Sequence, residues 1–125
     1  MKTPASILLG FILVSVVGAC TKPGTGGKAK IAGHVKHHEV HIPSAEVYIK
    51  YDATEFPGIN LSVYDNQTTA GSTDGYYEFV EMNKGDYYLY ARGYDGSISE
   101  VVTGGTPVEI KGKKEEVKID VQVAE

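Results

Sequence analysis

Hydrophobic and polar residues alternate with a period of two along most of the chain after residue 28. This period is typical of half-buried β-strands, and the 3.6-residue period of an amphipathic helix is missing from this part of the sequence. Turn residues such as Asp74-Gly75, Asn83-Lys84-Gly85 and Asp95-Gly96 separate the alternating runs. Short strands joined by turns predict an antiparallel β-sandwich. The alternation places these residues toward its core: Ile31, Gly33, Val35, Ala45, Val47, Ile49, Tyr77, Phe79, Tyr87, Leu89, Ala91, Val117, Ile119, Val121 and Val123.

The segment 52–66 interrupts the regular spacing of strands and contains Phe56-Pro57-Gly58. We expect a long loop here, with a short strand near residues 61–64. Further on, Gly85 predicts a hairpin turn that pairs Phe79 with Tyr87.

Four short motifs occur in an order that resembles the carboxypeptidase regulatory-like domain. They are Ile31-Ala32-Gly33-His34-Val35, Ile42-Pro43-Ser44-Ala45-Glu46-Val47, Thr73-Asp74-Gly75-Tyr76-Tyr77-Glu78-Phe79 and Lys84-Gly85-Asp86-Tyr87-Tyr88-Leu89. The resemblance covers about residues 31–123 and implies an all-β, seven-stranded, prealbumin-like sandwich. Ser44 and Lys84 replace the family's usual Gly and Pro, and the Thr-Asp turn lacks two residues before Gly75, which implies a shortened turn. Such sandwiches serve many functions, so the resemblance implies a fold rather than an activity.

The N-terminus has the layout of a secretory signal peptide. Lys2 precedes an apolar run over residues 5–19, which ends in the small residues Gly18 and Ala19 before Cys20. This arrangement resembles the lipobox of bacterial lipoproteins, with Val17 in place of the usual Leu. The resemblance implies cleavage before Cys20 and a covalent lipid on its thiol. The alternative is an uncleaved anchor, but fifteen helical residues span roughly 22 Å, less than the roughly 30 Å hydrocarbon core.

These boundaries divide the chain into a signal peptide (1–19), a lipidated flexible tether (20–28) and a sandwich domain (29–125). Two or three acyl chains would hold the protein stably on a membrane. Thr21, rather than Asp, follows Cys20 and resembles lipoproteins that move on to an outer membrane, where the cell has one. We therefore expect a lipid-anchored protein of the cell envelope.

The length, cysteine content and net charge of the mature chain limit which folds and binding partners are expected. Removal of residues 1–19 from the 125 leaves 106, enough for one domain with its own core. Cys20 is the only cysteine, so packing rather than disulfides must stabilise that domain. The formal net charge of the whole chain is −4, and loss of Lys2 makes it −5. Nucleic acid is therefore not an expected partner, and an acidic domain should gain little from anionic lipid headgroups.

All four histidines lie within eight residues, at His34, His37, His38 and His41, with Glu39 among them. The alternation places His34 on the outer face of its strand, and the other three histidines fall in the connection to the next strand. Imidazole and carboxylate ligands suit zinc, copper or nickel, so chain reversal could form a small surface metal site. The simpler interpretation is a polar loop rich in histidine, because the spacing matches no closed structural motif. The sequence therefore commits to no metal or other cofactor beyond the lipid on Cys20.

Tyrosine is abundant, with nine residues, while tryptophan is absent. The predicted hairpin would place Tyr76 opposite Tyr90 on the outer face of one sheet, with Tyr88 diagonal to both. Three outward rings could bind a sugar, a peptide or a protein. The alternative is that these tyrosines pair across strands because they suit a pleated, half-exposed surface.

Motifs for catalysis are missing from the sequence, which has neither a serine-centred elbow nor a phosphate-binding glycine loop. We therefore expect a non-enzymatic binding or assembly module, with another envelope protein or a glycan as partner. Two alternatives remain: a metal- or ligand-sensing lipoprotein that uses residues 34–41, and a surface adhesin or structural subunit.

Overall fold

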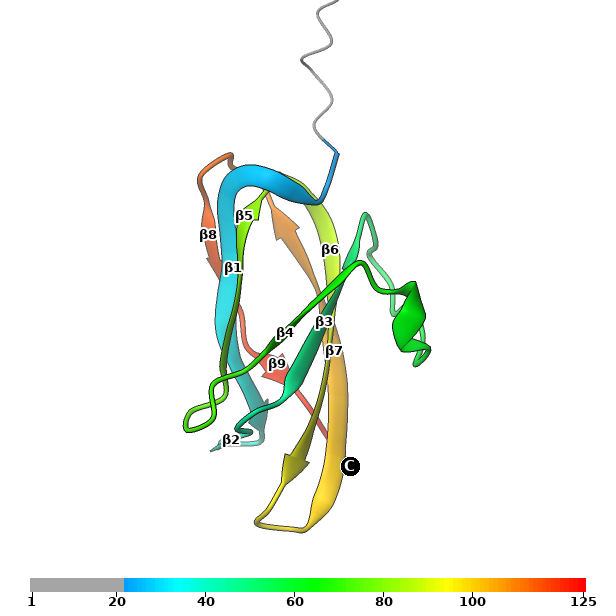
Figure 1. Ribbon diagram of the computed structural model, residues 1–125, viewed down its shortest axis with the longest axis vertical. Coiled ribbons are helices and arrows are strands. Elements are labelled where there is room, and N and C mark those ends of the chain that lie inside the picture. The colour runs from blue at the N-terminus through cyan, green and yellow to red at the C-terminus, as the bar shows by residue number, and fades with distance from the viewer. Residues whose placement is uncertain (1–21) are drawn as a thin grey trace, which may run out of the picture.

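The computed structural model describes residues 22–125, so the predicted signal peptide, Cys20 and Thr21 lie outside the described residues. Two β-sheets pack face to face around one core (Figure 1). The strands are β1 Thr25–His37, β2 Val40–His41, β3 Glu46–Tyr51, β4 Asn66–Thr69, β5 Tyr76–Met82, β6 Gly85–Asp95, β7 Glu100–Ile110, β8 Glu116–Lys118 and β9 Val121–Gln122. Within this part of the chain, no helix is long and apolar enough to cross a membrane.

The all-β sandwich is confirmed, but it has nine strands rather than seven and is not wholly antiparallel. One sheet is built around β1, which pairs with β2 and β5 in antiparallel fashion and with β8 and β9 in parallel fashion. The other sheet has the antiparallel order β4-β3-β6-β7. The parallel pairs arise because the chain leaves β7, turns at one end of the molecule and runs back alongside β1 (Figure 1).

The alternation of the sequence accounts for most of the core. In β6, Tyr87, Leu89 and Ala91 are fully buried between the sheets. Burial of such side chains contributes about 25 cal/mol per Å² of apolar surface, which is the main force that holds the two layers together. Val117 and Ile119 are only half-buried, because β8 lies at the margin of its sheet, whereas Val121 and Val123 are buried.

The predicted hairpin between Phe79 and Tyr87 is wrong. Strand β5 pairs with β1, whereas β6 pairs with β3 and β7, so residues 83–84 cross from one sheet to the other. Gly85 adopts a φ of 146°, a left-handed value that favours glycine, and Pro23 lies where a side chain at this position would project. The glycine therefore marks a crossover between layers rather than a hairpin turn.

The predicted strand at residues 61–64 is also wrong. Leu61–Val63 form a 3₁₀-helix, η1, because the Asn60 side chain accepts a hydrogen bond from the Ser62 backbone N–H at 3.1 Å. The strand of this region is β4, which follows η1 and pairs with β3. Its sequence, Asn-Gln-Thr-Thr, contains no apolar residue and so gives no alternating signal.

The folded part begins earlier than the predicted boundary at Ala29. Strand β1 begins at Thr25, and the Tyr87 hydroxyl accepts a hydrogen bond from the Gly24 backbone N–H at 2.7 Å. The Asn83 side chain donates to the Lys22 carbonyl oxygen at 3.1 Å. Residues 22–28 are therefore bound to the sandwich, which corrects the prediction that 20–28 form a flexible tether over their whole length.

The C-terminal strands connect the two sheets. After β9 pairs with β1, the Thr103 backbone N–H of β7 donates to the Ala124 carbonyl oxygen at 2.9 Å. The backbone passes so close to Gly33 and Gly104 that a Cβ on either would collide with the Ile119 or Gln122 carbonyl oxygen, respectively. This path brings Glu125 to the end of β1, beside His37.

Candidate functional site

A groove lies at the end of the sandwich where β1 ends, β2 begins and the β6–β7 hairpin turns; we call this the distal end (lower part of Figure 1). The distal end comprises the turns at residues 38–44, 71–75 and 95–99. The groove encloses about 360 Å³. It is lined by Val40, His41, Ile42, Pro43, Tyr94, Asp95, Gly96 and Ser97.

The surface of the groove combines apolar and hydrogen-bonding groups. The Tyr94 side chain is 54% exposed, and Val40 on the facing wall is also exposed. His41 and Pro43 are exposed beside Val40, and Ser97 supplies a hydroxyl on the hairpin side. A concave site with an aromatic ring and a few polar groups can accept a small ligand that has both an apolar face and hydroxyl groups.

A buried charged pair lies directly beneath this groove. His37 is only 6% exposed and Asp95 only 2%. The Nδ1 atom of His37 lies 2.8 Å from Oδ2 of Asp95, and its Nε2 atom lies 2.8 Å from Oε2 of Glu125. Because a neutral imidazole carries one N–H, donation to both carboxylates requires the protonated ring.

The pair shifts both protonation equilibria. The hydrogen bond to Asp95, together with the nearby Glu125 carboxylate, raises the pKa of His37 above its ordinary value. The Ser97 hydroxyl and then the His37 ring hold the pKa of Asp95 down at about 2. Near neutral pH the Asp95 carboxylate is therefore ionised. The raised pKa of His37 favours the charged ring, which neutralises that carboxylate in a position that water hardly reaches.

Asp95 also shapes one wall of the groove. Its Oδ1 atom accepts hydrogen bonds from the Ser97 backbone N–H at 2.9 Å and from the Ser97 hydroxyl at 2.6 Å. Its backbone carbonyl accepts from the Ile98 N–H at 3.3 Å. An aspartate that bonds to the backbone two residues ahead fixes a turn. Asp95 thus links the wall formed by residues 95–97 to His37 and, through it, to β1.

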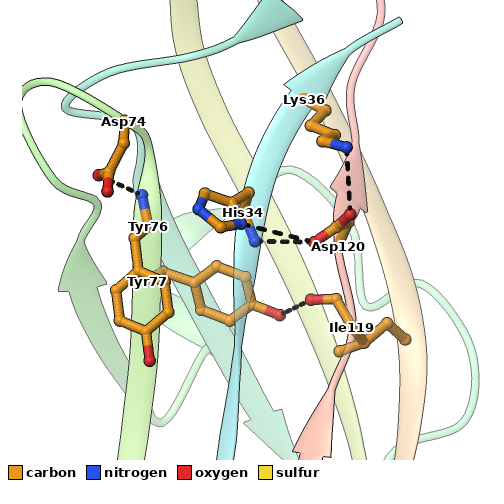
Figure 2. Close-up of polar contacts among 7 residues, drawn as sticks. All are labelled: His34, Lys36, Asp74, Tyr76, Tyr77, Ile119 and Asp120. Carbon is orange, nitrogen blue, oxygen red and sulfur yellow. Dashed lines mark hydrogen bonds and ion pairs between the residues drawn. The ribbon is translucent and has the colours of Figure 1, made fainter. Parts of the chain in front are cut away.

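The four histidines predicted as metal candidates do not converge on one point. His34 stacks on His41 with ring centroids 4.6 Å apart, and His37 lies beside His38 at the same separation. His37 belongs to the buried pair, and Figure 2 shows His34 directed instead toward Asp120 and Tyr76. In residues 22–125, no group of three or more His, Cys, Asp or Glu side chains is arranged to hold a metal ion.

The outer face around His34 is a network of ordinary polar contacts. Asp120 accepts a hydrogen bond from the His34 backbone N–H at 3.0 Å and lies 3.5 Å from the Lys36 ammonium group (Figure 2). The Tyr77 hydroxyl donates to the Ile119 carbonyl oxygen at 2.5 Å. These contacts hold the segment between β8 and β9 against β1, so they explain the fold rather than a site.

The predicted face of Tyr76, Tyr88 and Tyr90 is not one surface. Tyr76 lies on β5 in one sheet, and Tyr88 and Tyr90 lie on β6 in the other. Tyr90 is only 5% exposed, because Phe56 and Tyr64 of the long loop cover it at centroid distances of 5.4 and 5.8 Å. The loop thus occupies the face that was predicted to bind a ligand. Burial raises the pKa of Tyr64 to about 12, in keeping with this cover.

Sequence analysis missed Tyr94 and Asp95 as site residues. The sequence offered only one signal. His37 follows Ile31, Gly33 and Val35 at every second position of the strand, so its side chain should also face the core. A histidine in that series must have a polar partner in the interior. The sequence gives no indication that the partner lies 58 residues further on. The predicted lipid attachment site, Cys20, lies outside the described residues.

Comparison with known proteins supports the fold. No family model matches the chain, and no curated protein does. A crystal structure from Pseudomonas aeruginosa, described as that of a proposed carbohydrate binding protein, superposes with a TM-score of 0.54. The two chains are 13% identical, and the match covers 80% of this chain and 91% of the other. At this identity the match shows a common sandwich fold.

Proposed function

We propose that this chain is a non-enzymatic, lipid-anchored binding module of a bacterial cell envelope, and that its distal groove takes a glycan. The observation that carries the proposal is the exposed Tyr94 ring in a groove that also offers His41 and Ser97. One face of a pyranose ring consists of C–H groups and packs on an aromatic ring, while its hydroxyls need polar neighbours. The groove has both.

Two further observations support the proposal. The folded chain begins at the opposite end of the sandwich, so a lipid at Cys20 would leave the groove directed away from the membrane (Figure 1). The structural neighbour from Pseudomonas aeruginosa is described as a proposed carbohydrate binding protein. The resemblance to carboxypeptidase regulatory-like domains is compatible with a binding role, since that sandwich carries no catalytic centre of its own.

The lipid anchor is tested at Cys20. We expect Cys20→Ala to accumulate as a longer, unprocessed precursor, because cleavage and acylation both require the thiol at that position. Mass spectrometry of the native protein should find a modified N-terminal cysteine and no residues 1–19. An intact protein with a free Cys20 thiol would exclude the anchor while leaving the groove proposal standing.

The groove is tested with Tyr94→Ala. The protein is first applied to an array of bacterial and plant oligosaccharides, and the best-bound sugar is then titrated by calorimetry. Loss of ring stacking should weaken affinity by about tenfold or more, since each tenfold corresponds to about 1.4 kcal/mol.

Tyr88→Ala is the matched control, because Tyr88 lies on the same strand but away from the groove. Binding that survives Tyr94→Ala and is lost in Tyr88→Ala would move the site to the outer face of β6. Absence of binding to any sugar on the array would overturn the choice of a glycan.

A further inference from the structure

The end of the sandwich opposite the groove, here called the proximal end, carries an unequal share of positive charge. It comprises the turns at residues 22–24, 83–84 and 111–115, which lie together at the top of Figure 1. Direct contacts join them: the Asn83 backbone N–H donates to the Gly24 carbonyl oxygen at 2.8 Å, Gly85 pairs with Ile110, and the Lys30 N–H donates to the Glu115 carbonyl oxygen at 3.0 Å.

Five exposed lysines project from these three turns: Lys22, Lys84, Lys111, Lys113 and Lys114. In the part of the chain that the structure describes, none of the five forms an ion pair. The one carboxylate of these turns, on Glu115, accepts hydrogen bonds from the backbone N–H groups of Lys111 and Gly112 at 2.7 and 3.3 Å. Other carboxylates lie nearby. Glu81, Asp86, Glu109 and Glu116 belong to the strands, and Glu116 lies 3.9 Å from the Lys30 ammonium group. Asp52 belongs to the loop after β3, and its backbone N–H donates to the Asp86 carbonyl oxygen at 2.8 Å.

The distal end lacks such positive charge. Its turns at residues 38–44, 71–75 and 95–99 contain no lysine or arginine, and they carry the exposed carboxylates Glu39 and Asp74, while Asp95 is buried and paired with His37. The mature chain has an expected net charge of −5, but its charged side chains are unevenly distributed: the lysines of the turns lie at the proximal end and not at the distal end. Such a charge distribution orients a protein in an electric field even when its net charge is repelled.

The same end holds the point where the chain enters the fold. Tyr87, which is fully buried, accepts a hydrogen bond from the Gly24 N–H at 2.7 Å, and its hydroxyl also lies 2.7 Å from the Asn83 carbonyl oxygen. Residue 22 is two residues after Cys20, and two residues span at most about 7 Å. That is shorter than the screening length of about 8–10 Å at physiological salt. A lipid on Cys20 would thus bring the proximal lysines within reach of charged headgroups.

We infer that the proximal end rests on an anionic membrane surface through these lysines, which orients the sandwich upright with its groove outward. This inference rests on the proposed lipid anchor at Cys20. Each lysine near an anionic surface strengthens the attraction about fivefold. In the three turns themselves, the five lysines outnumber the one carboxylate, Glu115, so the tips of the proximal end are positively charged.

The test uses the full-length lipidated protein in vesicles of phosphatidylcholine, with or without phosphatidylglycerol. Because lipidation occupies the only native cysteine, one fluorophore can be placed on Thr25→Cys at the proximal end or on Ser72→Cys at the distal end. Quenching by a lipid that carries a quencher on its headgroup reports proximity to the surface. We expect strong quenching at residue 25, little at residue 72, and a larger contrast with phosphatidylglycerol present.

Charge variants identify the cause of the orientation. The triple variant Lys84→Gln/Lys113→Gln/Lys114→Gln should lose most of the effect of phosphatidylglycerol, since each lysine removed weakens attraction about fivefold. The matched control Lys36→Gln/Lys50→Gln/Lys118→Gln removes the same charge from the strands and should retain it.

Three outcomes would overturn the inference. Equal quenching at both positions, or an unchanged contrast in the proximal triple variant, would show an anchored domain that tumbles freely or is oriented by other contacts. Failure of the protein to associate with either kind of vesicle would instead show that the anchor is absent. The inferred orientation would then be rejected as well, because it depends on the anchor. Sugar binding by the groove is measured separately and is not decided by any of these results.

Discussion

Phe79→Ala should destabilise the domain by about 3–5 kcal/mol, the usual cost of removing a buried aromatic side chain. Phe79 lies on the inner face of β5, only 4% exposed, and packs edge-on against Tyr77 with ring centroids 6.2 Å apart. Its removal would leave a cavity between the sheets that neighbouring strands could fill only in part. Denaturant unfolding of the wild type and the variant measures the difference.

Val80→Ala is the control, because Val80 is the next residue of the same strand and points outward, 48% exposed. A surface substitution of this kind should change the free energy of unfolding by no more than about 0.5 kcal/mol. Equal losses in the two variants would contradict the inward position of Phe79 and the outward position of Val80 on β5.

His37→Ala should be the most damaging substitution at the distal end. Without His37, the Asp95 carboxylate would remain buried and lose its cation. Removal of one partner of a buried pair is strongly destabilising, because the remaining charge has neither water nor a counter-ion. We expect a clear fall in thermal stability, together with weaker sugar binding, because residues 95–97 form one wall of the groove.

The pair also predicts how stability depends on pH. The raised pKa of His37 means that its contribution is complete below the ordinary histidine pKa of about 6.5 and is lost as pH rises through the folded-state value. The pKa of Asp95 is lowered to about 2, so its contribution is present above about 3.9 and is lost as pH falls toward 2. The wild type should therefore be most stable between about pH 4 and pH 6.5.

His34→Ala provides the matched control for this prediction. His34 lies on the same strand but outside the buried pair, and its ring is partly exposed. Melting temperatures of the three proteins, measured across pH 4–9, should decline above about pH 6.5 in the wild type and in His34→Ala. His37→Ala should lack this decline. A decline that persists in His37→Ala would assign it to other groups.

The sequence predicts the layers of this protein better than the order of its strands. Alternation depends only on which residues face the core, so it identifies Leu89 and Val47 as core residues without knowledge of their neighbours. Pairing depends on the direction that each connection takes. A short turn at Gly85 is compatible both with a hairpin and with a crossover between sheets. In the structure β6 pairs with β3 and β7 rather than with β5, and these distant partners leave no signal in the sequence around Gly85.

The site was harder to predict for a related reason. The outward parity of Tyr90 was assigned correctly, but the ring is covered by Phe56 from a loop whose path has no periodicity. The clustering of four histidines made His37 a candidate metal ligand. In the structure its side chain faces inward and pairs with Asp95. The groove is made by segments more than 50 residues apart, around His41 and Tyr94. Such a site exists only once the two sheets have packed.

Nuclear magnetic resonance of the isotope-labelled protein, titrated with the best-bound oligosaccharide, tests the central claim most directly. If the distal groove takes a glycan, the largest saturable shift changes should fall on the backbone amides of His41, Tyr94 and Ser97. Amides on the outer face of β6, such as Tyr88, should move little. Saturable shifts confined to the loop around Phe56 and to Tyr88, with the distal turns unaffected, would contradict the account and assign binding to the opposite face of the second sheet.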